Sequence, residues 1–202
     1  MNEQDARDQI LNAALSLFAR QGFAHTSMND IVHQSGVSKG GVYWHFKSKD
    51  ALILAIFDAF FSGQEAILTN VLNSADSPAA RLRRLVVLAG AELEAATVSF
   101  PAPLEFYTLA AHNETLRARL AQFYTGYHEK LCLLLQEGID AGGWSETTAV
   151  VPTAHVLIST IEGVILLWSL FPDQINLRHQ MDTAVALLLA GLAVDKGLPS
   201  DR

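Results

Sequence analysis

A short stretch near the N-terminus, GVSKGGVYWHFKSKDAL at residues 36–52, gathers side chains that can bind a polyanion. Lysines supply positive charge, His45 a ring nitrogen and Tyr43 a hydroxyl, while Ser48 begins a helix whose free amides attract phosphate. No acidic residue lies between Ile31 and Lys49, although the whole chain carries a net charge of −7. The stretch is therefore a small electropositive surface on an acidic protein, and its chemistry is typical of phosphate-backbone binding.

Short helices are predicted to position these side chains. Ser27 and Asp30 form a capping-box pattern, which begins a helix that Gly36 ends after about two turns. Ser38 begins the next helix. An amphipathic helix precedes both, with apolar residues at three- and four-residue spacing: Ile10, Leu11, Ala14, Leu15, Leu17 and Phe18. Two short helices joined by a tight turn predict a helix-turn-helix, whose last helix can enter a DNA major groove.

The rest of the chain also has helical periodicity, and no stretch shows convincing strand alternation. Ser77 before Pro78 and Asn113 are expected to begin helices, and the Gly142–Gly143 pair is expected to end one. The predicted fold class is all-α with about nine helices. We expect a three-helix helix-turn-helix domain at residues 1–50 and a larger helical bundle at residues 51–202.

Composition excludes several classes of protein. A hydrophobic fraction of 50% and a charged fraction of 17% over 202 residues indicate a folded globular chain. The single cysteine, Cys132, excludes an internal disulfide framework, and its apolar helical surroundings favour an inert core thiol over a redox sensor. Polar interruptions in the apolar runs and a polar N-terminus predict a cytoplasmic protein without a membrane segment. No spacing of nucleophile and base indicates catalysis, so no catalytic residue, metal or cofactor is expected.

The run from Ile10 to Ile56, with LSLFARQGF and TSMNDIVHQSGVSKGGVYWHFKSKDAL, resembles the DNA-binding region of the TetR (tetracycline-repressor) family of transcriptional regulators. The resemblance implies an all-α homodimer, with operator DNA bound by the first three helices and the start of the fourth. It implies DNA contacts, to phosphates or in the groove, for Thr26, Ser27, Ser38, Lys39, Gly40, Gly41, Tyr43, Trp44, His45 and Lys49. Structural alternatives are a core position for Trp44, a packing role for Gly41 and a merely solvated Lys49.

The two C-terminal helices are apolar on nearly every side, and a helix of this kind is normally buried. A second copy of the chain or a plain monomer core would bury them, and the resemblance implies the first. The expected dimer-interface residues are Ile161, Gly163, Val164, Leu167, Trp168, Ala184, Leu187, Leu188 and Gly191. Glycine at 163 and 191 would allow close approach of helices.

A polar stripe interrupts the first of these helices, because His155, Ser159 and Glu162 fall at i, i+4 and i+7. Glu162 is expected to meet an arginine, face water or address a ligand, since burial of an unpaired carboxylate is costly. The stripe joins Phe100, Leu104, Tyr107, Tyr124 and Tyr127 as the candidate lining of an effector pocket. Such a lining favours a hydrophobic or aromatic effector with one polar contact. The arginines at 81, 83 and 84 are expected to form a solvated face.

Together these features predict a sequence-specific DNA-binding regulator. The resemblance favours a repressor that leaves a palindromic operator when a small effector binds the C-terminal domain. A transcriptional activator and an effector-independent DNA-binding protein of the same fold remain as alternatives.

Overall fold

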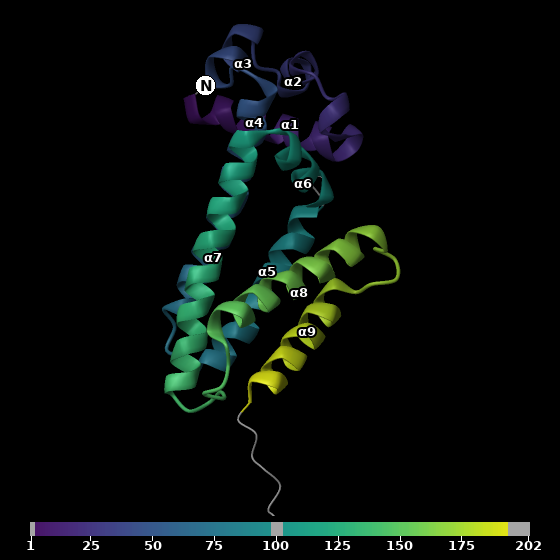
Figure 1. The fold of residues 1–202 in the computed structure, drawn as a ribbon. Coiled ribbons are helices and arrows are strands. Elements are labelled where there is room, and N and C mark those ends of the chain that lie inside the picture. The colour runs from purple at the N-terminus through teal and green to yellow at the C-terminus, as the bar shows by residue number, and fades with distance from the viewer. Residues whose placement is uncertain (1–2, 98–102, 194–202) are drawn as a thin grey trace, which may run out of the picture. The chain divides into compact units, whose positions relative to one another are not determined.

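The computed structural model describes residues 3–97 and 103–193, with the backbone alone for residues 96–97 and 103–106. Within these residues the chain is all-α, as predicted, and its only β-structure is an isolated bridge between Trp144 and Ala193. The described residues form nine helices: α1 (Glu3–His25), α2 (Met28–Ser35), α3 (Lys39–His45), α4 (Lys49–Leu72), α5 (Pro78–Thr97), α6 (Pro103–His112), α7 (Glu114–Asp140), α8 (Val150–Leu170) and α9 (Leu177–Leu192) (Figure 1).

The boundaries of the first helices follow from the capping residues. Ser27 Oγ accepts a hydrogen bond from the Asp30 amide at 3.2 Å, and the Asp30 carboxylate accepts one from the Ser27 amide at 2.8 Å, so the predicted capping box is present. The hydrogen bonds from Ser27 lower the pKa of Asp30 below its ordinary value. Gly36 ends α2 in the left-handed region with φ of 67°. Gly22, with φ of 77°, makes a kink inside α1.

The chain divides into two compact units, and the division points differ from the single domain boundary expected after residue 50. Unit 1 comprises Met1–Gln64 and Glu92–Leu120, and unit 2 comprises Glu65–Ala91 and Ala121–Arg202. The helices α4, α5 and α7 each contribute residues to both units, because they continue past the division points.

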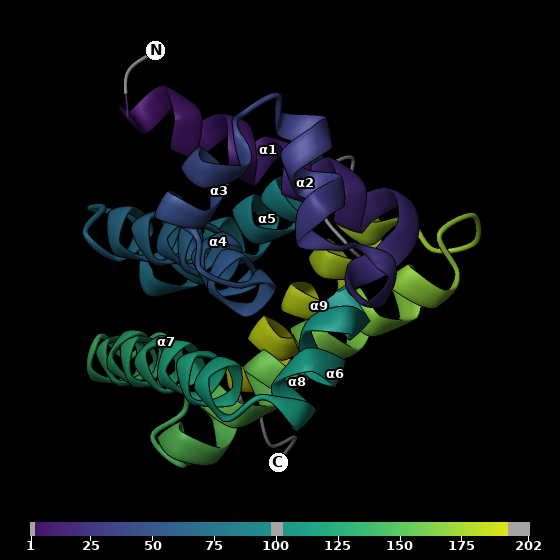
Figure 2. The same ribbon diagram turned by 90° about the horizontal axis from the view of Figure 1, so that it is seen from above.

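In unit 1, α1 packs against α2 and α3 to form a small three-helix head (Figure 2). Its interior contains Ile10, Phe18, Ile31, Val42 and Phe46, all buried. The apolar stripe predicted for the first helix therefore forms the surface against which the two short helices pack.

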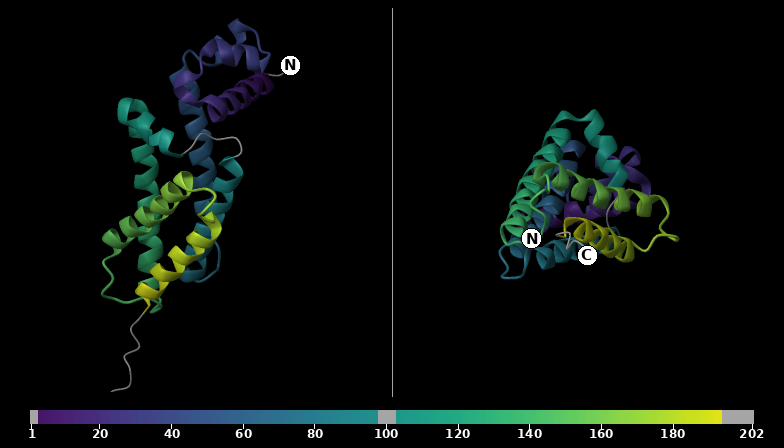
Figure 3. Two further views of the ribbon diagram at one scale, coloured as in Figure 1. Left: turned by 90° about the vertical axis from the view of Figure 1, so that its right-hand side faces the viewer. Right: turned by 60° about the horizontal axis from the view of Figure 1, so that its bottom comes forward.

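In unit 2, α8 and α9 pack against each other as a helical hairpin (Figure 3). Trp144 is buried where α7 turns toward α8, and it lies so close to Gly138 that a Cβ there would stand 2.1 Å from the indole ring. The Ser145 amide donates to the Leu192 carbonyl at 3.0 Å, which fixes the end of α9 to this turn. Gly138 is therefore required by the close approach of the indole.

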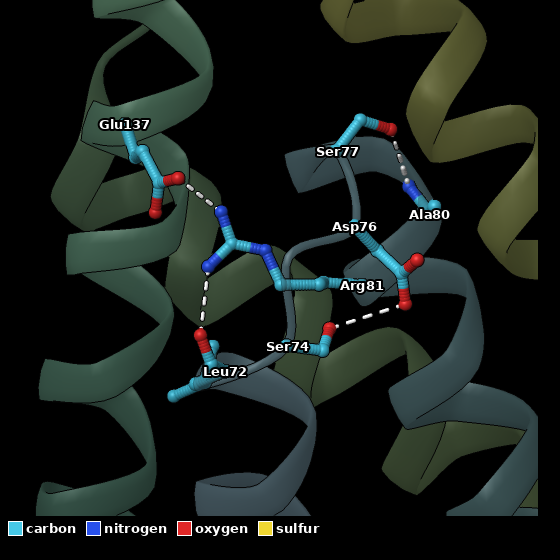
Figure 4. Close-up of polar contacts among 7 residues, drawn as sticks. All are labelled: Leu72, Ser74, Asp76, Ser77, Ala80, Arg81 and Glu137. Carbon is cyan, nitrogen blue, oxygen red and sulfur yellow. Dashed lines mark hydrogen bonds and ion pairs between the residues drawn. The ribbon is translucent and has the colours of Figure 1, made fainter.

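Arg81 contradicts the expectation of a solvated arginine face. Its side chain is 7% exposed, whereas Arg83 and Arg84 are exposed as expected. Arg81 Nη1 donates to the Leu72 carbonyl at the end of α4 at 2.8 Å, and Nη2 forms an ion pair with Glu137 of α7 (Figure 4). The guanidinium thus joins α4, α5 and α7 inside unit 2, and its buried Nε has no hydrogen-bond partner among the described residues.

Two helices, α4 and α8, match a membrane span in length and composition, which corrects the expectation that every apolar run is too short. Helices in the cores of soluble proteins meet the same test. Asp58 in α4 and Glu162 in the middle of α8 would be costly in a membrane interior. Only 11% of the apolar window of α8 is buried within the chain, so this helix keeps an uncovered surface.

Candidate DNA-binding surface and regulatory region

The helix α3 presents the electropositive surface predicted from the sequence. Ser38 caps it, its Oγ accepting from the Gly41 amide at 3.1 Å, while Val42 points into the head and is fully buried. On the other side, Lys39, Gly40 and Trp44 are exposed. Because the Trp44 side chain is 61% exposed, the alternative that it belongs to the core is wrong. Tyr43 and His45 are half-buried beside it.

The two adjacent glycines of α3 are there for different reasons. A Cβ at Gly41 would stand 2.9 Å from Val37 Cγ1 and 3.2 Å from Ser38 Oγ, so packing and the cap exclude a side chain. A Cβ at Gly40 would meet no atom of the described residues within 4 Å. Glycine costs about 1 kcal/mol relative to alanine inside a helix. No contact among the described residues accounts for that cost at Gly40.

The start of α2 contains one correction. Thr26 is 1% exposed, and its hydroxyl donates to the Gly22 carbonyl at 2.9 Å and accepts from Gln21 Nε2 at 3.2 Å. A buried hydroxyl with two partners inside the head cannot reach a phosphate, so the expected DNA contact of the Thr26 side chain is wrong. Ser27 is exposed, although its hydroxyl also serves the capping box.

Lys49, expected on the phosphate backbone, has partners inside unit 1. Its Nζ donates to the Phe23 carbonyl at 2.7 Å and to the Thr26 carbonyl at 3.1 Å, which uses two of its three N–H donors. Sequence reasoning missed these bonds because their acceptors are backbone carbonyls, which every residue carries. Lys39 and Lys47 are exposed, so they are the lysines of this surface best placed for phosphates.

The polar stripe of α8 faces α7. Tyr124 donates its hydroxyl to Glu162 at 2.7 Å, so a phenol meets this carboxylate. Burial raises the pKa of Tyr127 to about 12, and the nearby charge of Glu162 contributes to the rise. The Tyr127 residue as a whole keeps intermediate exposure.

Two further members of the stripe have their own contacts. His155 stacks on His128 of α7, with ring centroids 4.1 Å apart, and Ser159 Oγ donates to the His155 carbonyl at 2.8 Å. Cys132 lies 3.7 Å from the nearer nitrogen of His128. Burial raises the pKa of Cys132, and the charge of Glu129 adds to that effect. Among the residues described, no group of three or more histidine, cysteine or acidic residues is arranged to hold a metal ion.

Three further residues were expected in the pocket: Phe100, Leu104 and Tyr107. Phe100 lies outside the described residues, and for Leu104 only the backbone is described. Tyr107 is exposed and belongs to unit 1, whereas Tyr124 and Tyr127 belong to unit 2.

The hairpin of α8 and α9 carries a surface of exposed apolar side chains. Leu187 is 69% exposed, Leu167 is exposed, and a Cβ at Gly163 or Gly191 would meet no described atom within 4 Å. Ile161, Val164, Trp168 and Leu188 are half-buried. Exposed residues that sequence reasoning missed continue this surface: Leu166, Leu170 and Phe171. The monomer-core alternative is therefore wrong for much of this surface.

Ala184 is a correction within the expected dimer interface. It is 8% exposed and lies in the interior of its own chain together with Met181 and Val185. The helix α9 thus turns one side inward and another, containing Leu187, outward.

A three-helix head whose last helix is exposed is the arrangement of helix-turn-helix DNA-binding proteins, in which that helix enters the major groove. Residues 10–56 match the family described as "Bacterial regulatory proteins, tetR family", and residues 78–193 match "BetI-type transcriptional repressor, C-terminal". The chain belongs to the TetR family of transcriptional regulators. It is accordingly a DNA-binding regulator and not an enzyme.

Individual relatives agree with this assignment. The chain is 31% identical over 160 residues to the uncharacterized HTH-type transcriptional regulator YfiR of Bacillus subtilis, covering 78% of this chain and 77% of that protein. It is 26% identical over 202 residues to the HTH-type transcriptional regulator TtgR of Pseudomonas putida, covering 96% of each. The solved SmeT–triclosan complex, whose SmeT is the repressor of a Stenotrophomonas maltophilia multidrug efflux pump, has a TM-score of 0.80 at 23% identity, over 97% of this chain and 96% of that one. This last likeness shows the fold.

Proposed function

We propose that the protein is a repressor that binds a palindromic operator as a homodimer and leaves it when a small, largely hydrophobic effector binds the C-terminal region. The observation that carries the proposal is the exposed side of α3, where Trp44, Lys39 and Gly40 stand free of the core. In an isolated protein, the exposure of a tryptophan to water and a helical glycine that no neighbouring atom requires both lower stability. A DNA groove accounts for all three.

The DNA contacts divide into two kinds. In our proposal Lys39, Gly40, Tyr43 and Trp44 approach the groove, while Ser27, Ser38, His45 and the exposed Lys47 meet the phosphate backbone. Gly41 allows the turn beneath them, and Lys49 acts chiefly inside the head through its two carbonyl partners. Base recognition then depends on few side chains, and most of the affinity is electrostatic and sensitive to salt.

Dimerisation is proposed through α8 and α9. The exposed leucines at 166, 167, 170 and 187 form an apolar surface whose exposure to water is unfavourable. The open space at Gly163 and Gly191 would let a second hairpin approach closely. A two-fold dimer places two α3 helices in successive major grooves, about 34 Å apart, which is why we expect a palindromic operator.

The effector is proposed to bind in unit 2 near Tyr124, Tyr127 and Glu162. Aromatic rings with one carboxylate that accepts a hydrogen bond suit an apolar or aromatic molecule with one polar group. SmeT, a relative in fold, was solved with triclosan, and this supports the same class of ligand here. Release of DNA requires a coupling of about 1–3 kcal/mol between the two sites. A cytoplasmic location without a membrane segment follows from this role.

Activation of transcription is the second candidate, since the same contacts would serve an operator upstream of a promoter. The position of the bound site relative to the promoter distinguishes the two.

The test is a fluorescence-anisotropy titration with duplexes selected from a random pool by the wild-type protein, at two salt concentrations. We expect two chains per palindrome, and Lys47→Ala should weaken binding and reduce the salt slope by about one unit per chain. Lys130→Ala, in α7, is the matched control and should change neither. Selection of no sequence, or an equal loss for Lys130→Ala, would refute the assigned surface.

A further inference from the structure

The first turn of α4 holds two neighbouring residues whose side chains are tied to different parts of unit 1. Lys49 donates to the carbonyls of Phe23 and Thr26, and the Asp50 carboxylate accepts from Asn113 Nδ2 at 3.3 Å. Consecutive residues of a helix point about 100° apart, so they reach different neighbours. The region of Phe23 and Thr26 and the region of Asn113, which are far apart in the sequence, are therefore bonded to two adjacent residues of α4.

On one side, the tie reaches the first turn of α7. Asn113 precedes α7, and its Oδ1 accepts from the Leu116 amide at 3.1 Å, while its Nδ2 serves Asp50. One amide thus caps α7 and binds α4. Further along, Arg119 Nε donates to Asp58 at 2.5 Å, which joins the same two helices a second time. The start of α7 is therefore fixed to α4 at two successive points.

On the other side, the tie reaches the junction of α1 and α2. Phe23 follows the kink at Gly22, and Thr26 immediately precedes the capping residue of α2. The hydroxyl of Thr26 also donates to the Gly22 carbonyl at 2.9 Å. The ammonium of Lys49 thus holds both carbonyls that flank this junction, on which α2 and the following α3 depend for their orientation.

We propose that Asn113 is a positioning residue for DNA binding, acting through Asp50 and Lys49 on the junction that orients the head. A displacement of the first turn of α7 pulls on Asp50, and the adjacent Lys49 transmits that displacement to the carbonyls of Phe23 and Thr26. The inference rests on the proposed function for its effect on operator binding, whereas the ties themselves are observed in unit 1.

The test reverses the donor and the acceptor of the Asn113–Asp50 tie. Asn113→Asp keeps a good N-cap but places a second carboxylate against Asp50. The double variant Asn113→Asp with Asp50→Asn restores one donor and one acceptor. Asn176→Asp is the matched control, because Asn176 caps α9 through the His179 amide at 2.9 Å. Asn113→Ser, which keeps a cap and adds no charge, provides a milder break of the same tie.

Two readouts are measured on the full-length protein: hydrogen exchange of the amides at residues 23–27 and 49–53, and affinity for the duplex selected by the wild type. Asn113→Asp should exchange faster in both segments and bind about three- to tenfold more weakly, with an unchanged salt slope. The double variant should recover both properties, and Asn113→Ser should move both in the same direction by less. The Asn176→Asp control should resemble the wild type.

Normal exchange and affinity in Asn113→Asp, or failure of Asp50→Asn to rescue it, would overturn the proposal. If the wild type selects no duplex, the proposed function fails. The exchange data then test the role of the Asn113–Asp50 hydrogen bond separately. Wild-type exchange in the double variant supports that role, and exchange that stays fast refutes it.

Discussion

Substitutions at the Arg81–Glu137 ion pair of unit 2 test how the protein tolerates a buried guanidinium. We expect Glu137→Ala to destabilise the protein more than Arg81→Met, although Arg81 is the more buried partner, with 7% exposure against 54% for Glu137. The first change leaves a buried cation with only the Leu72 carbonyl as a described partner. The second removes the charge and keeps an apolar side chain of similar length.

The magnitudes follow from the geometry. Removing one partner of a fully buried pair costs about 3–5 kcal/mol, and because Glu137 is half exposed, water replaces part of its effect and leaves about 2 kcal/mol. Arg81→Met loses the bond to Leu72, worth about 1–2 kcal/mol, but it also removes the buried unpaired Nε, whose desolvation costs about as much. The net cost of Arg81→Met is therefore expected to be about 0–1 kcal/mol.

The assay is urea and thermal unfolding, followed by circular dichroism at one fixed protomer concentration, because stability of a dimer depends on concentration. Glu137→Ala should lower Tm by about 4–8 °C, and the double variant should match Arg81→Met alone. A larger loss for Arg81→Met than for Glu137→Ala would contradict this expectation, because it would show that the guanidinium contributes net stability.

Three further outcomes are expected. Gly138→Ala should cost about 1–3 kcal/mol in urea unfolding despite its better helix propensity, because the new methyl meets the Trp144 ring; an unchanged midpoint would contradict this. Gly40→Ala should raise stability by up to about 1 kcal/mol while weakening DNA binding, and unimpaired binding would remove the assigned groove approach. Stability should fall above pH 10 by up to about 1.4 kcal/mol per pH unit, because the Tyr127 pKa of about 12 lies above its unfolded value; Tyr127→Phe should abolish that part of the slope.

Local patterns predicted much of the head. The capping box at Ser27 and the left-handed Gly36 depend on neighbours within a few residues, so sequence alone indicates them. The buried stripe of α1 follows from its periodicity. Asn113 was likewise predicted as a cap, but its second role toward Asp50 required knowledge of which helix lies beside it.

Other features depend on tertiary register. Arg81 stands four residues before the buried Leu85, on the apolar side of α5, and this spacing was the one available signal that it is not solvated. The pairing of Tyr124 with Glu162 depends on how α7 and α8 align. In α9, Ala184 and Leu187 are both apolar and one turn apart, so periodicity could not decide which of them faces inward.

The three tryptophans occupy three different environments. Trp44 is exposed on α3, Trp144 is buried behind Gly138, and Trp168 is half-buried on α8. Indole emission shifts with exposure to water, so variants that retain one tryptophan each would report optically on separate events. Trp44 would report contact at α3, Trp144 unfolding of unit 2 and Trp168 association through α8, without any attached dye.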